Sequence, residues 1–197
     1  MQTKNLIQRK ALELFNKKGV RNVTLRDVAK ELDKSYGNIT YHFPTKEHLL
    51  TEIFFDSISK ISNVERLDLA HMNTFEKYIR ISELNYLFLK KYFFIILDKR
   101  DLQIIYPKLF NKIDFNNLIL KEKRISILIE LQKEGLLKKN LTTSVFDFIL
   151  ELTLGITNTF FQDFEQKVDL KKEYITKMKK LLFPYLTDKG KLVYIKF

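Results

Sequence analysis

Turn-forming residues are scarce in this chain, which has five glycines and three prolines among 197 residues. A β-sandwich or β-barrel needs many tight turns, whereas long helices joined by short loops need few. Hydrophobic residues make up 45% of the chain, which is enough for a well-buried core. We therefore predict an all-α protein that, at this length, forms one compact unit with at most a small appended module.

The residue types also limit the chemistry that the chain can perform. Cysteine is absent, which excludes disulfides, thiolate catalysis and cysteine-ligated zinc. The three histidines, His42, His48 and His71, do not have the spacing of a zinc-binding motif. The nucleophile-elbow, dinucleotide-binding and P-loop patterns are absent from the sequence as well. We predict that the protein is not an enzyme and needs neither a metal nor another cofactor.

Basic residues outnumber acidic residues by 35 to 24, which gives a net charge of +11. Such a charge favours polyanionic partners, with nucleic acid ahead of an anionic membrane. The first 50 residues carry +5 of this charge, from ten basic and five acidic residues, so positive charge is densest there. The chain begins without the apolar core of a signal peptide, and its apolar runs are too short to span a bilayer. We expect a cytoplasmic protein with no membrane partner.

Apolar residues recur at helical spacing along most of the chain. The first helix is predicted over residues 4–18, and two short helices follow at 24–33 and 35–42. Further helices are predicted over residues 45–61, 74–97, 111–134, 143–164 and 170–186. Residues 101–110 contain a proline and are expected to form irregular turns.

Two short helices with so tight a link are typical of a helix-turn-helix. In the second of them, Ile39 and Phe43 are four residues apart and can both face a core, which leaves polar side chains for a DNA major groove. Asn38 has the amide that pairs bidentately with adenine, and Thr40 has a methyl group that can contact thymine. Gly37 costs a helix interior about 1 kcal/mol relative to alanine. Either a close approach to DNA or a loose first turn explains that glycine.

Phosphate contacts are expected where helices begin. The N–H groups after Thr24 and Thr45 are free to bind phosphates, and Lys46 adds a positive charge beside them. Thr24 can also cap its helix, in a capping box that has Asp27 where Glu or Gln is usual. The predicted DNA-binding residues are Thr24, Arg26, Ser35, Tyr36, Gly37, Asn38, Thr40, Tyr41, His42 and Lys46.

Residues 5–50 resemble the DNA-binding region of the tetracycline-repressor (TetR) family of bacterial transcriptional regulators. The matching residues are Ala11, Leu14, Phe15, Gly19, Thr24, Val28, Ala29, Leu32, Ser35, Gly37, Ile39, His42, Phe43, Lys46, Leu49 and Leu50. One departure lies before the His-Phe pair, where many members have Leu-Tyr-x and this chain has Ile39-Thr40-Tyr41. The tyrosine is therefore displaced by one residue, about 100° around a helix. Residues 129–159 resemble, more loosely, the segment that leads into the dimerisation surface of the family.

The resemblance implies a three-helix helix-turn-helix DNA-binding domain at residues 1–47 and a helical ligand-binding and dimerisation domain at residues 48–197. It also implies a homodimer that binds a palindromic operator and leaves it when a small molecule binds. In the family the last two helices usually form the dimer contact. The interface residues expected on that basis are Phe146, Ile149, Leu150, Leu154, Ile175, Met178 and Leu182.

Aromatic side chains in the middle of the chain have two interpretations. They are either ordinary bundle core or the wall of a pocket for an apolar or aromatic ligand. The candidate ligand-binding residues are Tyr78, Tyr86, Phe88, Tyr92, Tyr106, Phe110 and Phe115.

Two functions remain open from the sequence. The first is a dimeric, ligand-responsive repressor that binds double-stranded DNA. The second is a helical interaction module of the same fold that no longer reads DNA specifically, an alternative left open by the displaced tyrosine.

Overall fold

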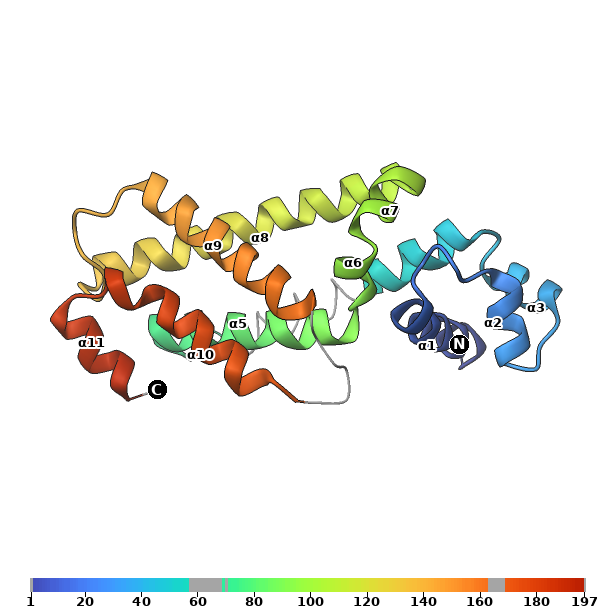
Figure 1. Cartoon of the computed structure of the whole chain (residues 1–197), viewed down its shortest axis with the longest axis horizontal. Helices are drawn as coiled ribbons and strands as arrows, with labels where there is room; N and C mark the ends of the chain where they lie inside the picture. The colour runs from blue at the N-terminus through green and yellow to red at the C-terminus, as the bar shows by residue number, and fades with distance from the viewer. Residues whose placement is uncertain (1, 57–68, 70, 163–168, 197) are drawn as a thin grey trace. The chain divides into compact units, whose positions relative to one another are not determined.

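The computed structural model describes residues 2–56, 69, 71–162 and 169–196, with side chains described except at 2 and 114–120. These parts consist of helices and the turns and loops that join them. Figure 1 shows the elements in chain order. The helices are α1 (Gln2–Lys18), α2 (Leu25–Glu31), α3 (Tyr36–His42), a helix over residues 46–56, α5 (Thr74–Lys91), α6 (Phe94–Leu97), α7 (Lys99–Ile105), α8 (Pro107–Lys133), α9 (Thr143–Gln162), α10 (Lys171–Leu182), the 3-10 turn η1 (Phe183–Tyr185) and α11 (Asp188–Ile195). The predicted all-α class is confirmed.

The chain packs as two compact units. One consists of Met1–Asn63 with Lys91–Asp114, and the other of Val64–Lys90 with Phe115–Phe197. We call them the head unit and the body unit. The head unit therefore contains the helix-turn-helix together with α6 and α7, which lie far from it in the sequence. The predicted boundary at residue 47 divides the chain by function, into DNA-binding and ligand-binding residues. The packing of the chain does not test this division, which stays a prediction.

The predicted helix over 74–97 is interrupted, because α5 ends at Lys91 and α6 begins at Phe94. Asn16 of α1 occupies this break. Its amide nitrogen donates to the carbonyl of Lys91 (2.9 Å), and its amide oxygen accepts from the N–H of Phe94 (3.0 Å). The side chain of Asn16 thus satisfies backbone groups that the interrupted helix leaves without helical partners. Contacts of this kind come from a distant part of the sequence, so periodicity did not reveal the break.

Two predictions about proline were also wrong in detail. Residues 101–110 are helical except at Tyr106, because α7 continues to Ile105 and Pro107 begins α8 at the first helical position, where its missing N–H costs nothing. The predicted helix 170–186 stops at Leu182, since Pro184 cannot continue it, and the short turn η1 leads into α11. Helix α11 was not predicted.

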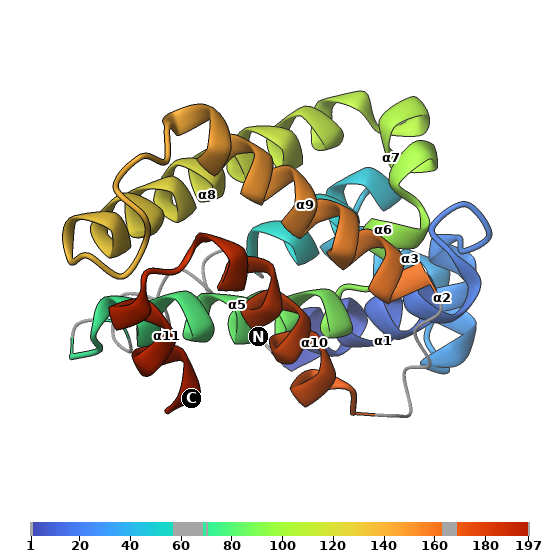
Figure 2. The ribbon, with the colours of Figure 1, turned by 60° about the vertical axis from the view of Figure 1, so that its left-hand side comes forward.

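The hydrophobic core of the body unit has members from α5, α8, α9 and α10, and from the segments that follow α8 and α10. Figure 2 shows these four helices as a ribbon. The most buried members of the core are Phe75, Leu128, Leu131, Leu137, Phe146, Ile149, Leu182 and Leu186. Helix α9 is the one helix, among the parts of the chain that the structure describes, that is long and apolar enough to cross a membrane. Its face with Phe146 and Ile149 belongs to this core, as expected for a core helix of a globular unit.

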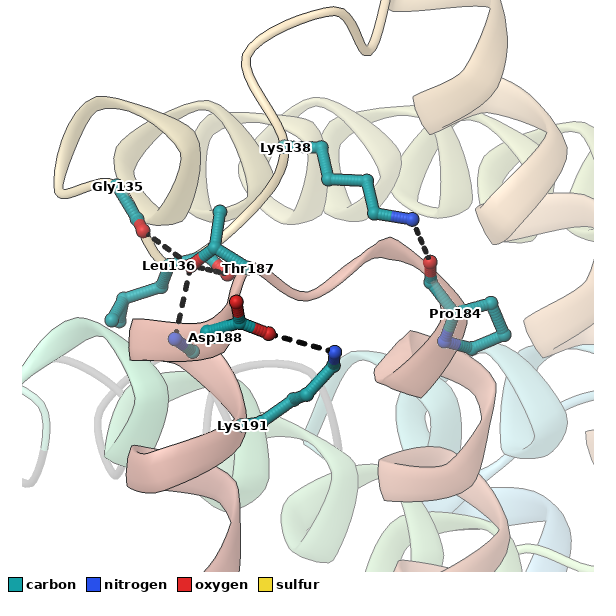
Figure 3. Close-up of polar contacts among 8 residues, drawn as sticks. Gly135, Leu136, Lys138, Pro184, Thr187, Asp188 and Lys191 are labelled. Atoms are coloured by element: carbon teal, nitrogen blue, oxygen red, sulfur yellow. Dashed lines mark hydrogen bonds and ion pairs between the residues drawn. The ribbon is translucent and has the colours of Figure 1, made fainter.

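Helix α11 is held against the turn that follows α8 (Figure 3). The hydroxyl of Thr187 donates to the carbonyl of Gly135 (2.7 Å), and the N–H of Thr187 donates to the carbonyl of Leu136 (3.0 Å). The ammonium of Lys138 donates to the carbonyl of Pro184 (2.8 Å). At Gly190, a Cβ atom would overlap the carbonyl oxygen of Leu136. Only glycine therefore lets α11 approach this turn so closely.

Candidate nucleic-acid interface

Helix α2 begins with a complete capping box. The hydroxyl oxygen of Thr24 accepts from the N–H of Asp27 (3.2 Å), and the carboxylate of Asp27 accepts from the N–H of Thr24 (2.7 Å). The side-chain and backbone hydrogen bonds from Thr24 hold the pKa of the Asp27 carboxyl below its ordinary value. Aspartate thus completes the box that the sequence matched only in part, and the start of α2 is well defined.

A short turn joins α2 to α3. Asp33 adopts a left-handed backbone (φ 51°), and the N–H of Lys34 donates back to the carbonyl of Ala29 (3.0 Å). Aspartate tolerates this conformation better than most residues do. Ser35 then caps α3, because its hydroxyl oxygen accepts from the N–H of Asn38 (3.1 Å). The predicted helix-turn-helix is therefore present, with both short helices capped by their own side chains.

Helix α3 has one buried and one exposed face. Ile39 and Phe43 are fully buried, as the spacing predicted. Tyr41 is 83% exposed and Tyr36 47% exposed. The other predicted reading residues are exposed or half-buried, and they are Ser35, Gly37, Asn38, Thr40 and His42. All of these residues lie on a single short helix whose buried side anchors it to the head unit.

Two contacts restrict side chains on this face. The guanidinium of Arg26, on α2, lies over the ring of Tyr36 at 5.3 Å from its centre, a cation–π geometry. The hydroxyl of Thr40 donates to the carbonyl of Tyr36 (3.1 Å), with the carbonyl of Gly37 at 3.3 Å. The Thr40 hydroxyl is thus occupied within the helix, and the predicted contact with thymine relies on its methyl group.

No neighbouring group in the described structure requires a glycine at position 37. A Cβ atom there would meet only the hydroxyl of Ser35, at 3.9 Å, which is an ordinary contact. The backbone φ of Gly37 does not lie in the left-handed region, unlike those of Gly19 and Gly135. Neither packing nor conformation within the chain therefore accounts for this residue.

The ammonium of Lys46 has a structural role that the sequence did not predict. It donates to the carbonyls of Val20 (2.6 Å) and Val23 (2.7 Å) in the loop before α2. Burial lowers the pKa of this lysine. A phosphate contact by Lys46 stays a prediction, and it has to use the third N–H of the ammonium.

Asp98, between α6 and α7, binds the same loop before α2, a role that the sequence did not predict. Its carboxylate accepts from the N–H of Val20 (2.6 Å). Burial raises the pKa of Asp98, while the hydrogen bond from Val20 and the charge of Lys46 oppose the rise. Lys46 and Asp98 therefore fix the loop through its carbonyl and N–H groups respectively. No sequence signal pairs residues 78 positions apart, so this contact needed the structure.

The predicted ligand-binding aromatics do not form one group. Tyr92, Tyr106 and Phe110 belong to the head unit, and Tyr78, Tyr86 and Phe88 to the body unit. The side chain of Phe115 lies outside the described residues. Tyr86 is fully buried among Phe161 and Tyr174, which is the bundle-core interpretation. Among the described residues, a small cavity of the body unit is lined by side chains of α5, α8, α9 and α10, and of the predicted set Tyr78 alone lines it.

Most of the predicted dimer residues are buried within the chain. Five of them are at most 8% exposed, and these are Phe146, Ile149, Leu150, Met178 and Leu182. Ile175 is half-buried, and Leu154 is 55% exposed on α9. Phe148, which was not predicted, is 50% exposed on the same helix. Leu154 and, in part, Ile175 are therefore the predicted side chains that remain available for a partner, and Phe148 adds a third.

Comparison with known proteins supports the helix-turn-helix assignment. Residues 7–53 match the family model of bacterial regulatory proteins, tetR family. The probable HTH-type transcriptional regulator YttP of Bacillus subtilis (strain 168) is 31% identical over 83 residues. That alignment covers 40% of this chain and 40% of YttP, so the similarity spans less than half of that regulator.

Solved structures share the fold of the whole chain. A TetR-family transcriptional regulator from Marinobacter aquaeolei VT8 superposes with a TM-score of 0.86 at 24% identity, covering 100% of this chain and 97% of that one. The ketosteroid regulator KstR2 of Mycobacterium tuberculosis has a TM-score of 0.78 at 16% identity, covering 94% and 96%. A protein from Saccharomonospora viridis in complex with choline has a TM-score of 0.80 at 17% identity, covering 94% and 98%.

The matched family consists of regulatory proteins, in agreement with the prediction that the chain is not an enzyme. Residues 7–53 therefore match the TetR family of bacterial regulatory proteins, and the whole chain has the fold of a solved TetR-family regulator.

Proposed function

We propose that the protein is a DNA-binding transcriptional regulator of the cytoplasm that reads a palindromic operator as a homodimer. The observation that carries this proposal is the exposed face of α3, where Tyr36, Asn38 and Tyr41 are exposed together with Gly37, a glycine that no described neighbour requires. A helix anchored on one side and polar on the other is what a major groove admits. The concentration of positive charge in the first 50 residues supports the same role.

In this proposal Asn38 reads a base, and Arg26 and Tyr36 act as a pair. Asn38 is exposed in the first turn of α3, and its amide can pair bidentately with adenine. Since Arg26 lies over the ring of Tyr36, the pair presents a cation and an aromatic ring together beside the reading face. Thr24, Ser35 and Lys46 contact phosphates, and residues 1–47 form the DNA-binding domain.

Replacing Asn38 tests the reading role. Asn38→Ala should weaken binding to the specific operator by about 1–3 kcal/mol and leave non-specific binding unchanged, because the amide contacts a base and not a phosphate. Asn111→Ala on α8 is the matched control, since Asn111 is an exposed helical asparagine outside both the reading face and the proposed dimer helices. Affinities are measured by fluorescence anisotropy at several salt concentrations. Equal losses on operator and unrelated DNA would contradict base reading by Asn38.

The dimer in this proposal uses α9 and α10, with residues 48–197 as the dimerisation and ligand-binding domain. Leu154 and Phe148 provide exposed apolar contacts on α9, and Ile175 provides a half-buried one on α10. Buried residues such as Phe146 and Met178 support this surface from beneath. Two-fold symmetry places the two reading helices on half-sites of a palindrome.

A small ligand releases the operator by favouring a separation of the two α3 helices that does not match the half-sites. Structures of the same fold support a ligand-binding role, because one holds choline and another is a γ-butyrolactone receptor with a TM-score of 0.72. The alternative, a module of this fold without specific DNA binding, predicts salt-sensitive binding without sequence preference, or no binding.

A further inference from the structure

We propose that Asp98 is a positioning residue for DNA binding, which sets the direction of α3 by holding the loop before α2. The inference rests on the proposed function and adds to it a residue outside residues 1–47. Asp98 lies between α6 and α7, far from the reading face in the sequence, and packs within the head unit. It acts through the backbone of Val20 and does not itself contact DNA.

The two short helices have few buried side chains to fix their direction. Helix α3 buries Ile39 and, at its C-cap, Phe43. The buried side chains of α2 are Leu25, Val28 and Ala29. Apolar burial is not directional, so a helix with so few apolar contacts can tilt at little cost. Hydrogen bonds at the ends of these helices, which fix distance and angle, therefore decide their direction.

Lys46 connects the segment after α3 with the segment before α2. It follows Phe43 by three residues, and its ammonium donates to the carbonyls of Val20 and Val23. Both valines are fully buried, so their carbonyls need partners within the protein. Val23 directly precedes Thr24, the N-cap of α2. The start of α2 and the end of α3 are thus tied to the same loop.

Asp98 brings the opposite charge to this loop. Its carboxylate accepts from the N–H of Val20 (2.6 Å), whose carbonyl accepts from the ammonium of Lys46 (2.6 Å). Gly19 makes room for the carboxylate, since a Cβ atom there would lie 3.0 Å from Oδ1 of Asp98. Both backbone polar groups of Val20 are therefore bound to charged side chains, whose hydrogen bonds are stronger than those of neutral groups.

Asn16 fixes the segment that carries Asp98. Its amide binds the carbonyl of Lys91 and the N–H of Phe94. The ring centre of Phe94 also lies 5.8 Å from that of Phe15 on α1. Asp98 is four residues beyond Phe94, and its N–H donates to the carbonyl of Phe94 (2.8 Å). Helix α1 thus positions the carboxylate, and the carboxylate positions the loop.

Loss of this carboxylate should therefore change DNA reading more than general affinity for DNA. A tilt of α3 misaligns contacts to bases, which depend on hydrogen-bond geometry, whereas non-specific binding depends mainly on charge. This difference separates a positioning residue from a residue that only stabilises the fold. A variant that is merely less stable, but still folded, binds both kinds of DNA as the wild-type protein does.

Fluorescence anisotropy on the full-length protein tests the inference. The probes are the operator that the wild-type protein selects from a random pool and an unrelated duplex of equal length. Asp98→Ala should weaken operator binding tenfold or more and change binding to the unrelated duplex less than twofold. Asp98→Asn keeps the shape and one acceptor oxygen without the charge, and should weaken operator binding threefold to tenfold. Urea unfolding establishes which variants are folded in the assay, and Asp98→Asn decides if Asp98→Ala is not.

Asp101→Asn is the matched control. Asp101 lies in the first turn of α7, three residues beyond Asp98, and makes no hydrogen bond to the loop among the residues that the structure describes. It should bind both duplexes as the wild-type protein does. The inference is overturned if a folded Asp98 variant binds the operator at wild-type strength, or if it loses affinity for both duplexes equally.

Nuclear magnetic resonance gives a second measurement, which needs no DNA. In ¹H–¹⁵N spectra, Asp98→Ala should move the amide signals of Asn38 and Tyr41 in α3 as well as that of Val20, and Asp101→Asn should leave all three in place. A change confined to the loop would overturn the positioning role. If the wild-type protein selects no operator, the proposed function fails, and the α3 signals still decide whether Asp98 positions this helix.

Discussion

At the scale of single residues, Gly37 is the position where stability and function are expected to oppose each other. Alanine stabilises a helix relative to glycine, and none of the residues that the structure describes blocks a Cβ atom at position 37. If α3 lies in a major groove, the added methyl group meets DNA instead.

We therefore predict that Gly37→Ala keeps or raises the free energy of unfolding but weakens operator binding. Gly155→Ala is the control, because a Cβ atom at Gly155 of α9 has no neighbour within 4 Å. It should raise the free energy of unfolding by about 0.5–1 kcal/mol, and it serves as a control for stability alone because Gly155 lies on a helix of the proposed dimer contact. Urea unfolding and fluorescence anisotropy give the two readouts. Operator binding by Gly37→Ala at wild-type strength would favour the loose first turn as the reason for this glycine.

Which residues of α3 are buried could be predicted from the sequence, and which groups hold Lys46 could not. Ile39 and Phe43 follow from helical spacing, a property of adjacent turns. The carbonyls of Val20 and Val23 that bind the ammonium of Lys46 lie 26 and 23 residues away, in a loop without periodicity.

At the scale of elements, the capping box of α2 connects stability to pH. The pKa of Asp27 is lowered in the folded protein by its hydrogen bonds with Thr24. A carboxyl with a lowered pKa stabilises the fold above its unfolded pKa, near 4, and this contribution is lost as the pH falls through the folded pKa.

Asp27→Asn should therefore destabilise the protein at pH 7 and have a smaller effect as the pH falls below 4. Thr24→Ala removes the cap itself and should cost about 1 kcal/mol at pH 7. Urea unfolding from pH 7 to pH 3 measures both variants against wild type. A difference between Asp27→Asn and wild type that does not change with pH would contradict an ionised Asp27 in the box.

Helix ends were predicted where a capping residue next to the helix marks them, and missed where contacts between residues distant in the sequence determine them. Thr24 and Ser35 are caps recognisable from sequence, and both are caps in the structure. The break after Lys91 depends on Asn16 of α1, and the position of α11 depends on Gly190 meeting Leu136. The residues of each pair are far apart in the sequence. No local sequence pattern therefore predicts the break after α5 or the close approach of α11.

At the scale of the whole molecule, the sequence predicted the order of helices but not their division into units. Residues 91–114 pack with the N-terminal helices, through contacts such as Asp98 with Val20, although they follow them by more than 30 residues. Sequence periodicity shows that a helix has an apolar face and does not show which partner covers it. For the same reason, five of the predicted dimer residues are covered within the chain.

The proposed dimer depends on the exposed apolar residues of α9. Leu154→Lys should shift the protein from dimer to monomer at micromolar concentration, because a lysine on each side of a two-fold contact is both desolvated and repelled. Leu192→Lys is the matched control, since Leu192 of α11 is also exposed (67%) but lies outside the proposed contact. Sedimentation velocity distinguishes the two species. An unchanged dimer in Leu154→Lys, or dissociation in Leu192→Lys alone, would place the contact elsewhere.

In the proposed function, the two α3 helices of a dimer read DNA together. Selection of bound duplexes from a random DNA pool at physiological salt measures this reading. We expect enrichment of one palindrome whose half-site centres lie about 34–36 Å apart, or a multiple of that distance. Asn38→Ala should lose this enrichment while it still binds DNA non-specifically. Recovery of no preferred sequence by dimeric wild-type protein would overturn paired reading by α3 and favour a module of this fold that does not read DNA.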